Sequence, residues 1–169
     1  KNSIFFVDIK KKKILIQNQI TKKKNILRVD KEIGFITQIK KNIFVLGLQS
    51  ELRIVNLNTL KTILSINVEA NKTNNRINDG KIDSENRLWF GTMNNIHNKK
   101  SGSLYCLDNN LVLHRVDKNY YITNGPAFID KFNFYHTDSI KKIIYKIKID
   151  RKFKVLRKKT FIKFKKNQG

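Results

Sequence analysis

A pair of short apolar runs recurs four times along this chain at nearly constant spacing. The second run of each pair alternates apolar and polar residues and occupies residues 13–16, 52–55, 103–107 and 143–147. The first run is aromatic and aliphatic, and its successive starts are 39, 45 and 44 residues apart, at Ile4, Ile43, Leu88 and Phe132. Runs of this composition are typical of strands, and a period of about 40–45 residues with several strands per period is typical of β-propeller blades. One blade cannot bury both its faces, so blades stack and the stack closes into a ring.

The length of the chain leaves the number of blades open. About fifteen strands of four to seven residues fit into 169 residues, and no segment of ten or more residues keeps the apolar spacing of a helix. At one blade per period the chain holds roughly four blades, whereas propellers have about four to eight. The sequence therefore predicts an all-β chain that forms either a four-bladed ring or part of a six-bladed one.

The charge of the chain admits two interpretations. The formal net charge is +23, from 36 Lys and Arg residues against 13 Asp and Glu residues. A nucleic-acid or anionic-membrane surface is one explanation. The other is a surface that became lysine-rich with genome composition, because Lys, Ile and Asn are all products of A/T-rich codons. Only 7 of the 36 cations are Arg and the lysines are spread from end to end, so nucleic-acid binding is the less favoured interpretation.

Composition excludes several other classes of protein. Cys106 is the single cysteine, which excludes a disulfide framework and a cysteine-rich zinc site, and we expect it to be a small core residue. No stretch approaches the roughly 20 apolar residues of a membrane helix, so no membrane partner is expected. The short apolar run after Lys1 is not a signal peptide. A cytoplasmic protein is expected, with its own N-terminus missing from this sequence.

Two polar stretches precede strands and carry the candidate site residues. The first is residues 74–83, where Arg76, Asn78 and Asp79 would lie at the mouth of a propeller channel and could bind a ligand. The second contains Asn124, 46 residues after Asn78 and hence one blade later, whose side-chain oxygen suits a hard divalent cation. Asn-Asp-Gly and Asn-Gly are also ordinary turn sequences, and turns remain the alternative for both stretches.

A third stretch, residues 136–139, places a His, an Asp and a Ser nearly in succession. Neighbours in one strand cannot converge as the three members of a catalytic triad do, so we do not predict a triad there.

These stretches together resemble the regucalcin/gluconolactonase (senescence marker protein) family. The run Asn-Arg-Ile-Asn-Asp-Gly-Lys at residues 75–81, followed by Gly-Thr-Met at 91–93, is the most specific part of the resemblance. Weaker matches are residues 2–9, Gly102–Tyr105, Asn124-Gly125 and residues 135–139, in family order along nearly the whole chain.

The resemblance implies a six-bladed β-propeller of which this chain holds about three and a half blades, with residues 1–169 forming a single partial domain. It implies one divalent cation in the channel, Ca²⁺ or Zn²⁺, or else Mg²⁺ or Mn²⁺. By resemblance, Arg76 and Asn78 bind substrate and Asn124 is a metal ligand.

Three departures from the family pattern bear on activity. The family's first metal ligand is a Glu upstream of Asn2, before this chain starts, and its catalytic Asp lies beyond Gly169. An acidic substrate contact after Gly-Thr-Met is absent or replaced by Asn95. No catalytic residue is therefore expected within the chain, and the 169 residues alone are expected to be inactive.

The function that the resemblance implies is metal-dependent hydrolysis of sugar lactones by the complete protein. A propeller that binds calcium or a sugar without turnover is the first alternative, and a basic nucleic-acid-binding protein is the second.

Overall fold

The computed structural model describes residues 2–165, which form fifteen β-strands and no helix. No helix in this part of the chain could therefore cross a membrane. The strands are five to nine residues long, so several exceed the expected length. In chain order they are β1 (Ser3–Asp8), β2 (Lys13–Asn18), β3 (Lys24–Arg28), β4 (Ile33–Lys40), β5 (Ile43–Leu48), β6 (Glu51–Asn56), β7 (Lys61–Asn67), β8 (Asn75–Ile82), β9 (Leu88–Asn94), β10 (Gly102–Leu107), β11 (Leu113–Tyr120), β12 (Thr123–Phe128), β13 (Asn133–Asp138), β14 (Ile143–Ile149) and β15 (Val155–Lys163).

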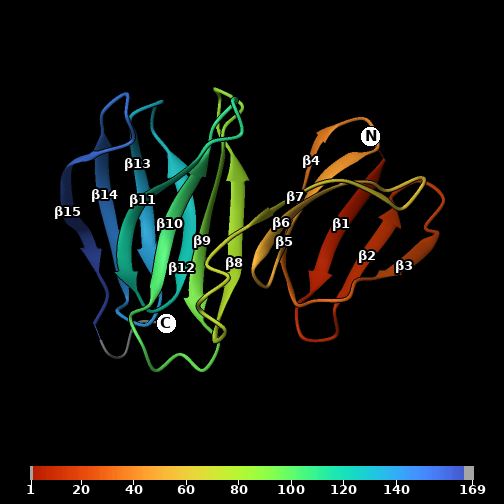
Figure 1. The fold of residues 1–169 in the computed structure, drawn as a ribbon, viewed down its shortest axis with the longest axis horizontal. Helices are drawn as coiled ribbons and strands as arrows, with labels where there is room; N and C mark the ends of the chain where they lie inside the picture. The colour runs from red at the N-terminus through yellow and green to blue at the C-terminus, as the bar shows by residue number, and fades with distance from the viewer. Residues whose placement is uncertain (1, 166–169) are drawn as a thin grey trace. The chain divides into compact units, whose positions relative to one another are not determined.

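The strands form four antiparallel sheets that follow the four sequence repeats (Figure 1). Their strand orders are β1-β2-β3, β4-β5-β6-β7, β11-β10-β9-β8 and β12-β13-β14-β15. The two runs of each repeat are adjacent strands in one sheet, namely β1–β2, β5–β6, β9–β10 and β13–β14. The all-β prediction and the repeat assignment are thus confirmed, while the six blades and the single domain over residues 1–169 stay predictions.

The chain divides into two compact units, residues 1–77 and 78–169. In the first unit, Ile14, Ile33 and Leu48 are almost fully buried between the first two sheets. The rings of Phe5 and Phe44 pack beside them, with centroids 4.8 Å apart. Alternation along each strand supplies this core, because every second side chain points to the same face.

The second unit is built around Trp89 of β9. Its indole packs on Phe134 with ring centroids 4.9 Å apart and is 1% exposed. The indole N–H donates to Oδ2 of Asp83 at 2.8 Å, and the same oxygen accepts from Nε of Arg87 at 2.7 Å. Trp89 therefore buries a large apolar area while its one polar group stays bonded, which is the usual condition for a buried indole.

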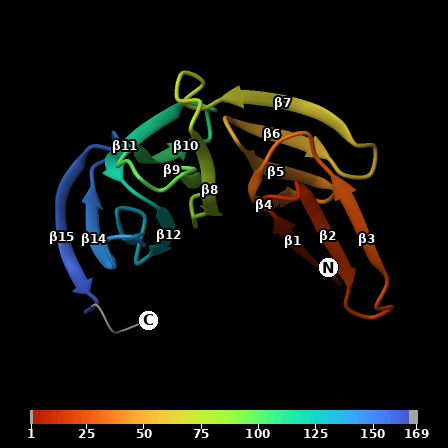
Figure 2. The ribbon, with the colours of Figure 1, turned by 90° about the horizontal axis from the view of Figure 1, so that it is seen from below.

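A glycine brings the two sheets of the second unit close together where β12 begins. A Cβ atom on Gly91 of β9 would lie 2.1 Å from Oγ1 of Thr123, a distance that no side chain tolerates. The Thr123 hydroxyl instead donates to the carbonyl of Thr92 at 3.0 Å. Because Gly91 lacks a side chain, β12 can start directly against β9, with β9 and β12 seen side by side in Figures 1 and 2.

Candidate functional site

The side chains of Asn78, inside β8, and Asn124, near the start of β12, meet in the second unit. Nδ2 of Asn78 donates to Oδ1 of Asn124 at 3.0 Å and to the carbonyl of Thr123 at 2.8 Å. Nδ2 of Asn124 donates in turn to Oγ of Ser139 at 2.7 Å. This second bond fixes the Asn124 amide with its oxygen toward Asn78. The 46-residue separation predicted that the two asparagines occupy equivalent positions in successive blades, and in the structure their side chains are in direct contact.

A second contact with the same sequence separation lies beside the first. Oδ2 of Asp79 accepts from the backbone N–H of Gly125 at 2.9 Å. Gly125 has φ +88°, in the region that favours glycine, and the pairing of β12 with β13 is irregular between Asn124 and Ala127. This bulge exposes the Gly125 N–H to the carboxylate, so residues 78–79 hold residues 124–125 through two bonds.

The turn interpretation of the first polar stretch is wrong. Residues 78–80 lie inside β8, which runs to Ile82 and pairs with β9. Asn-Asp-Gly favours a turn by local propensity, but here pairing with β9 and the bond from Gly125 hold the segment extended. Asn124-Gly125 likewise lies within β12, at its bulge. Residues 78–80 and 124–125 therefore lie in strands and not in loops that lead into strands.

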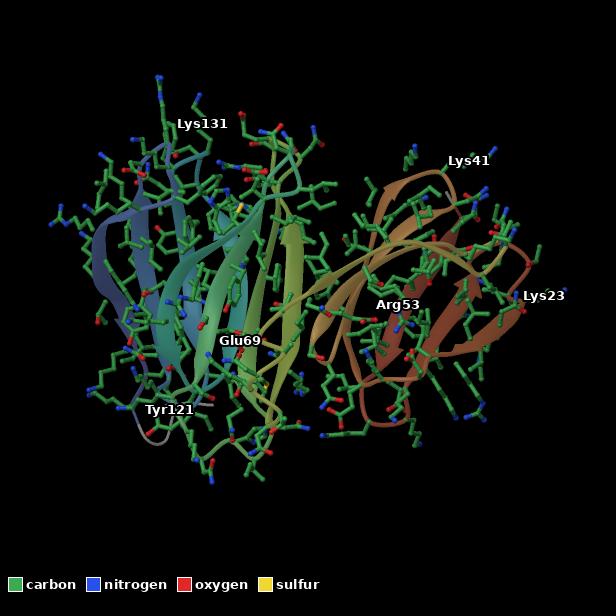
Figure 3. The ribbon with its side chains drawn as sticks, in the orientation of Figure 1. Lys23, Lys41, Arg53, Glu69, Tyr121 and Lys131 are labelled. Carbon is green, nitrogen blue, oxygen red and sulfur yellow. The ribbon has the colours of Figure 1, made fainter. Side chains whose placement is uncertain are left out.

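A buried carboxylate supports the Asn124 end of the site. Asp138 is 0% exposed, and its oxygens accept from the backbone N–H groups of Tyr121 (3.2 Å), Ile122 (3.5 Å) and Lys141 (3.4 Å). These bonds tie the start of β12 to the β13–β14 turn, which carries Ser139. Figure 3 labels Tyr121 at this end of the unit and Lys131 at the other.

Arg76, the other predicted substrate residue, contacts Glu32 and the Ile77 carbonyl in the first unit. Its side chain is 8% exposed, with Nε 3.8 Å from Oε2 of Glu32, and Nη1 donates to the carbonyl of Ile77 at 3.1 Å. Burial lowers the pKa of the Arg76 guanidinium and Glu32 opposes that shift. Arg76 stands two residues before Asn78 in β8, and its role toward a substrate stays a prediction.

The exclusion of a triad at residues 136–139 agrees with the structure. His136 is 1% exposed, and neither of its ring nitrogens has a hydrogen-bond partner within the described residues. Desolvation lowers the pKa of His136 to about 3, so the ring is neutral at pH 7. The Ser139 hydroxyl is instead bonded to Asn124.

The buried thiol of Cys106 is not a nucleophile. Desolvation raises its pKa well above the ordinary value, which keeps it protonated. Cys106 is 0% exposed and packs in the core around Trp89, as the sequence predicted.

The Asn124 oxygen has the chemistry of a hard-cation ligand. A carbonyl oxygen has two lone pairs, and the bond from Asn78 uses one of them, so the second is available to a cation. Ca²⁺ takes six to eight oxygen ligands. Residues 2–165 contain no group of three or more His, Cys, Asp or Glu side chains that could hold a metal, and the role of Asn124 as a metal ligand stays a prediction.

Comparison with known proteins gives the family. The sequence model of the SMP-30/Gluconolactonase/LRE-like region matches residues 1–169. The chain belongs to this family. Regucalcin of Xenopus laevis is 29% identical over 178 residues, a match that covers 99% of this chain and 58% of that protein.

Two solved structures have the same fold as this chain. A luciferin-regenerating enzyme superposes with a TM-score of 0.86 at 28% identity, covering 96% of this chain and 57% of that one. A calcium-binding regucalcin from Agrobacterium tumefaciens gives a TM-score of 0.87 at 18% identity, covering 96% and 56% respectively. The chain therefore spans somewhat more than half the length of these relatives.

The sequence considered Ser139 only as a member of a rejected triad, and it gave no role to Thr123. Ser139 orients the Asn124 amide, and the Thr123 carbonyl holds Asn78. The 46-residue period relates positions in successive blades. It gives no information on contacts within one blade, and the contact between Asn124 and Ser139 is of that kind.

Proposed function

We propose that this chain is part of a metal-dependent hydrolase of sugar lactones. The observation that carries the proposal is the hydrogen bond between the side chains of Asn78 and Asn124. It places the two amides side by side and fixes the orientation of the Asn124 oxygen. Membership of a family that includes gluconolactonases supplies the reaction class. The relatives are nearly twice as long, so the activity is proposed for a complete protein in which the partial propeller of residues 1–169 belongs to a six-bladed ring.

In the proposed site Asn124 binds a divalent cation through Oδ1. Ca²⁺ or Zn²⁺ is the preferred ion, with Mg²⁺ or Mn²⁺ as alternatives, and when bound it polarises the lactone carbonyl as a Lewis acid. The remaining ligands and the general base are proposed to come from outside residues 2–165. We propose the cytoplasm as the compartment.

The other residues of the chain position the substrate. We propose that Asn78 binds a sugar hydroxyl while its Nδ2 group keeps Asn124 oriented, and that Arg76 donates to the lactone oxygens. Water adds to the carbonyl carbon, the ring C–O bond breaks, and the ring oxygen takes up a proton to become a hydroxyl. The product is an aldonic acid, which loses its own proton to the solvent.

The test is the ring-opening rate of an aldonolactone with the complete protein. Activity should disappear after treatment with EDTA and return when Ca²⁺ or Zn²⁺ is added, and residues 1–169 alone should show no turnover. Activity that persists after chelation would overturn the metal dependence. Metal binding without turnover of any aldonolactone would overturn catalysis in favour of a binding propeller.

A further inference from the structure

A groove runs between the first two sheets of the chain, at the end of the first unit where β4 turns into β5. Its volume is about 870 Å³, within the range of about 300–1,000 Å³ that is typical of small-molecule sites. The apolar part of its lining, which we call the groove floor, consists of Phe5, Ile16, Leu27, Phe44 and Leu57. All five residues belong to the first unit, whereas the candidate site is in the second.

The strand register shows that the groove is not on the face where a further blade would stack. Phe5 lies opposite Ile16, and Ile16 lies opposite Asn25, so these three side chains share one face of the sheet β1–β3. That face is turned toward the second sheet, because the ring of Phe5 packs on Phe44 of β5. Phe6, the next residue, points to the other face. The groove therefore lies between two sheets that the chain itself contains, and the proposed six-bladed ring keeps both.

Two turns form the polar rim of the groove. Lys40 ends β4, Lys41 follows it in the turn to β5, and both are exposed side chains that line the groove. Leu57 follows β6, and its backbone N–H donates to the carbonyl of Asn42 at 2.9 Å. This bond ties the β6–β7 turn to the β4–β5 turn. The rim is thus a built structure that holds two cationic side chains beside the groove floor.

The first unit separates its charges along the strands. Successive strands are antiparallel, so the β4–β5 turn with Lys41 lies at one end (Figure 3), and the β1–β2, β3–β4 and β5–β6 connections lie at the other. The acids of residues 1–77 all lie in or next to these three connections or just after β7, and each forms a salt bridge with a basic side chain there: Asp8, Asp30, Glu32, Glu51 and Glu69. Neither Lys40 nor Lys41 forms a salt bridge with a described acid.

The groove thus combines an apolar floor with a positively charged rim. Among the described residues that line it none is acidic, and the other polar groups include the amides of Asn25 and Gln38. Ile16 and Leu27 are only half-buried, so an apolar chain laid on the floor would remove further apolar surface from water. A carboxylate at the rim would accept charge-assisted hydrogen bonds from lysine. A ligand with an apolar chain and one anionic end satisfies both parts of the lining.

We propose that this groove binds the anion of a medium-chain fatty acid. The carboxylate accepts hydrogen bonds from Lys40 and Lys41, and the hydrocarbon chain lies along the groove floor. The proposal is independent of lactone hydrolysis, because the groove shares no residue with the candidate site around Asn78 and Asn124.

The test is isothermal titration calorimetry of decanoate with the 169-residue chain, with decanol as a neutral probe of the same length. Both should bind, and octanoate should bind roughly tenfold more weakly than decanoate because it buries two fewer methylene groups. Lys40→Gln/Lys41→Gln should raise the Kd for decanoate by at least about tenfold and leave that for decanol unchanged. The matched control, Lys22→Gln/Lys23→Gln, removes the same charge from two exposed lysines of the β2–β3 turn and should change neither Kd.

Asn25→Trp tests the place of binding. A ring at this exposed position, in the row of Phe5 and Ile16, should fill the groove and abolish binding of both probes at an unchanged melting temperature. Failure of decanoate to bind the parent chain would overturn the proposal, and so would probe binding that survives Asn25→Trp. Equal weakening by the two lysine variants would overturn it in favour of net charge alone. A parent dimer that Asn25→Trp dissociates would overturn it in favour of a second copy of the chain as the occupant.

Discussion

Asn78 and Asn124 are 46 residues apart in the sequence, and their side-chain amides are 3.0 Å apart in the structure. This hydrogen bond joins β8 to β12. One position later in each strand, the Asp79 carboxylate accepts a second hydrogen bond, from the Gly125 N–H. Two equivalent strand positions are thus coupled side by side. The first prediction below measures this coupling directly.

The Asn78–Asn124 bond should be measurable as a coupling free energy. Asn78→Ala, Asn124→Ala and the double variant form a double-mutant cycle in urea unfolding of the chain. We expect an interaction of about 0.5–1.5 kcal/mol, the net value of a typical hydrogen bond. The cycle cancels the separate bond from Asn78 to the Thr123 carbonyl. Strictly additive single variants would show that the amides are not coupled.

Gly91→Ala should destabilise the second unit. The new Cβ would lie 2.1 Å from the Thr123 hydroxyl oxygen, so β12 must move away from β9. Overpacking of this kind costs about 1–3 kcal/mol, measured as a loss in the free energy of unfolding. Ser84→Ala, at an exposed turn position, is the control and should change little. An unchanged Gly91→Ala variant would contradict the close approach of the two strands.

His136→Leu should make the chain less sensitive to acid. The folded-state pKa of His136 is about 3, because burial disfavours its charged form, whereas the ordinary value is 6.5. Between these values the unfolded chain binds the extra proton, so His136 lowers stability as the pH falls below 6.5. The gap in the free energy of unfolding between variant and parent should shift in favour of Leu by about 2 kcal/mol from pH 7.5 to pH 5.

The control for that experiment is His97→Asn, at an exposed turn residue with φ +58°. This variant removes an exposed histidine instead of a buried one, so it separates the effect of burial from the mere loss of an imidazole. Parallel pH profiles for the parent and His136→Leu would show that His136 is protonated within the fold.

Much of the fold could be predicted from the sequence, because the apolar runs at Ile43 and Leu88 repeat with the period of the sheets they build. The turns could not. Positive φ angles occur at Leu60 and Phe153, two positions that carry neither glycine nor asparagine. Asn78-Asp79-Gly80 is the opposite case, since turn-forming residues are held extended there by pairing in β8 and by the bond from Gly125 to Asp79.

The site was predictable to the extent that it repeats. The period gave Asn78 and Asn124 as equivalent positions, but not Ser139, whose contact with Asn124 lies within one sheet.

The metal dependence of an Asn124→Ala variant tests the central claim most directly. In the complete protein, the initial rate of aldonolactone opening is measured against Ca²⁺ or Zn²⁺ concentration for the parent, for Asn124→Ala, and for Asn58→Ala as an exposed control. If Asn124 is a metal ligand, its variant should need at least about tenfold more metal for half-maximal rate, the loss of about 1.4 kcal/mol of binding. The control should match the parent. An Asn124→Ala protein with the parent's metal dependence would contradict the account.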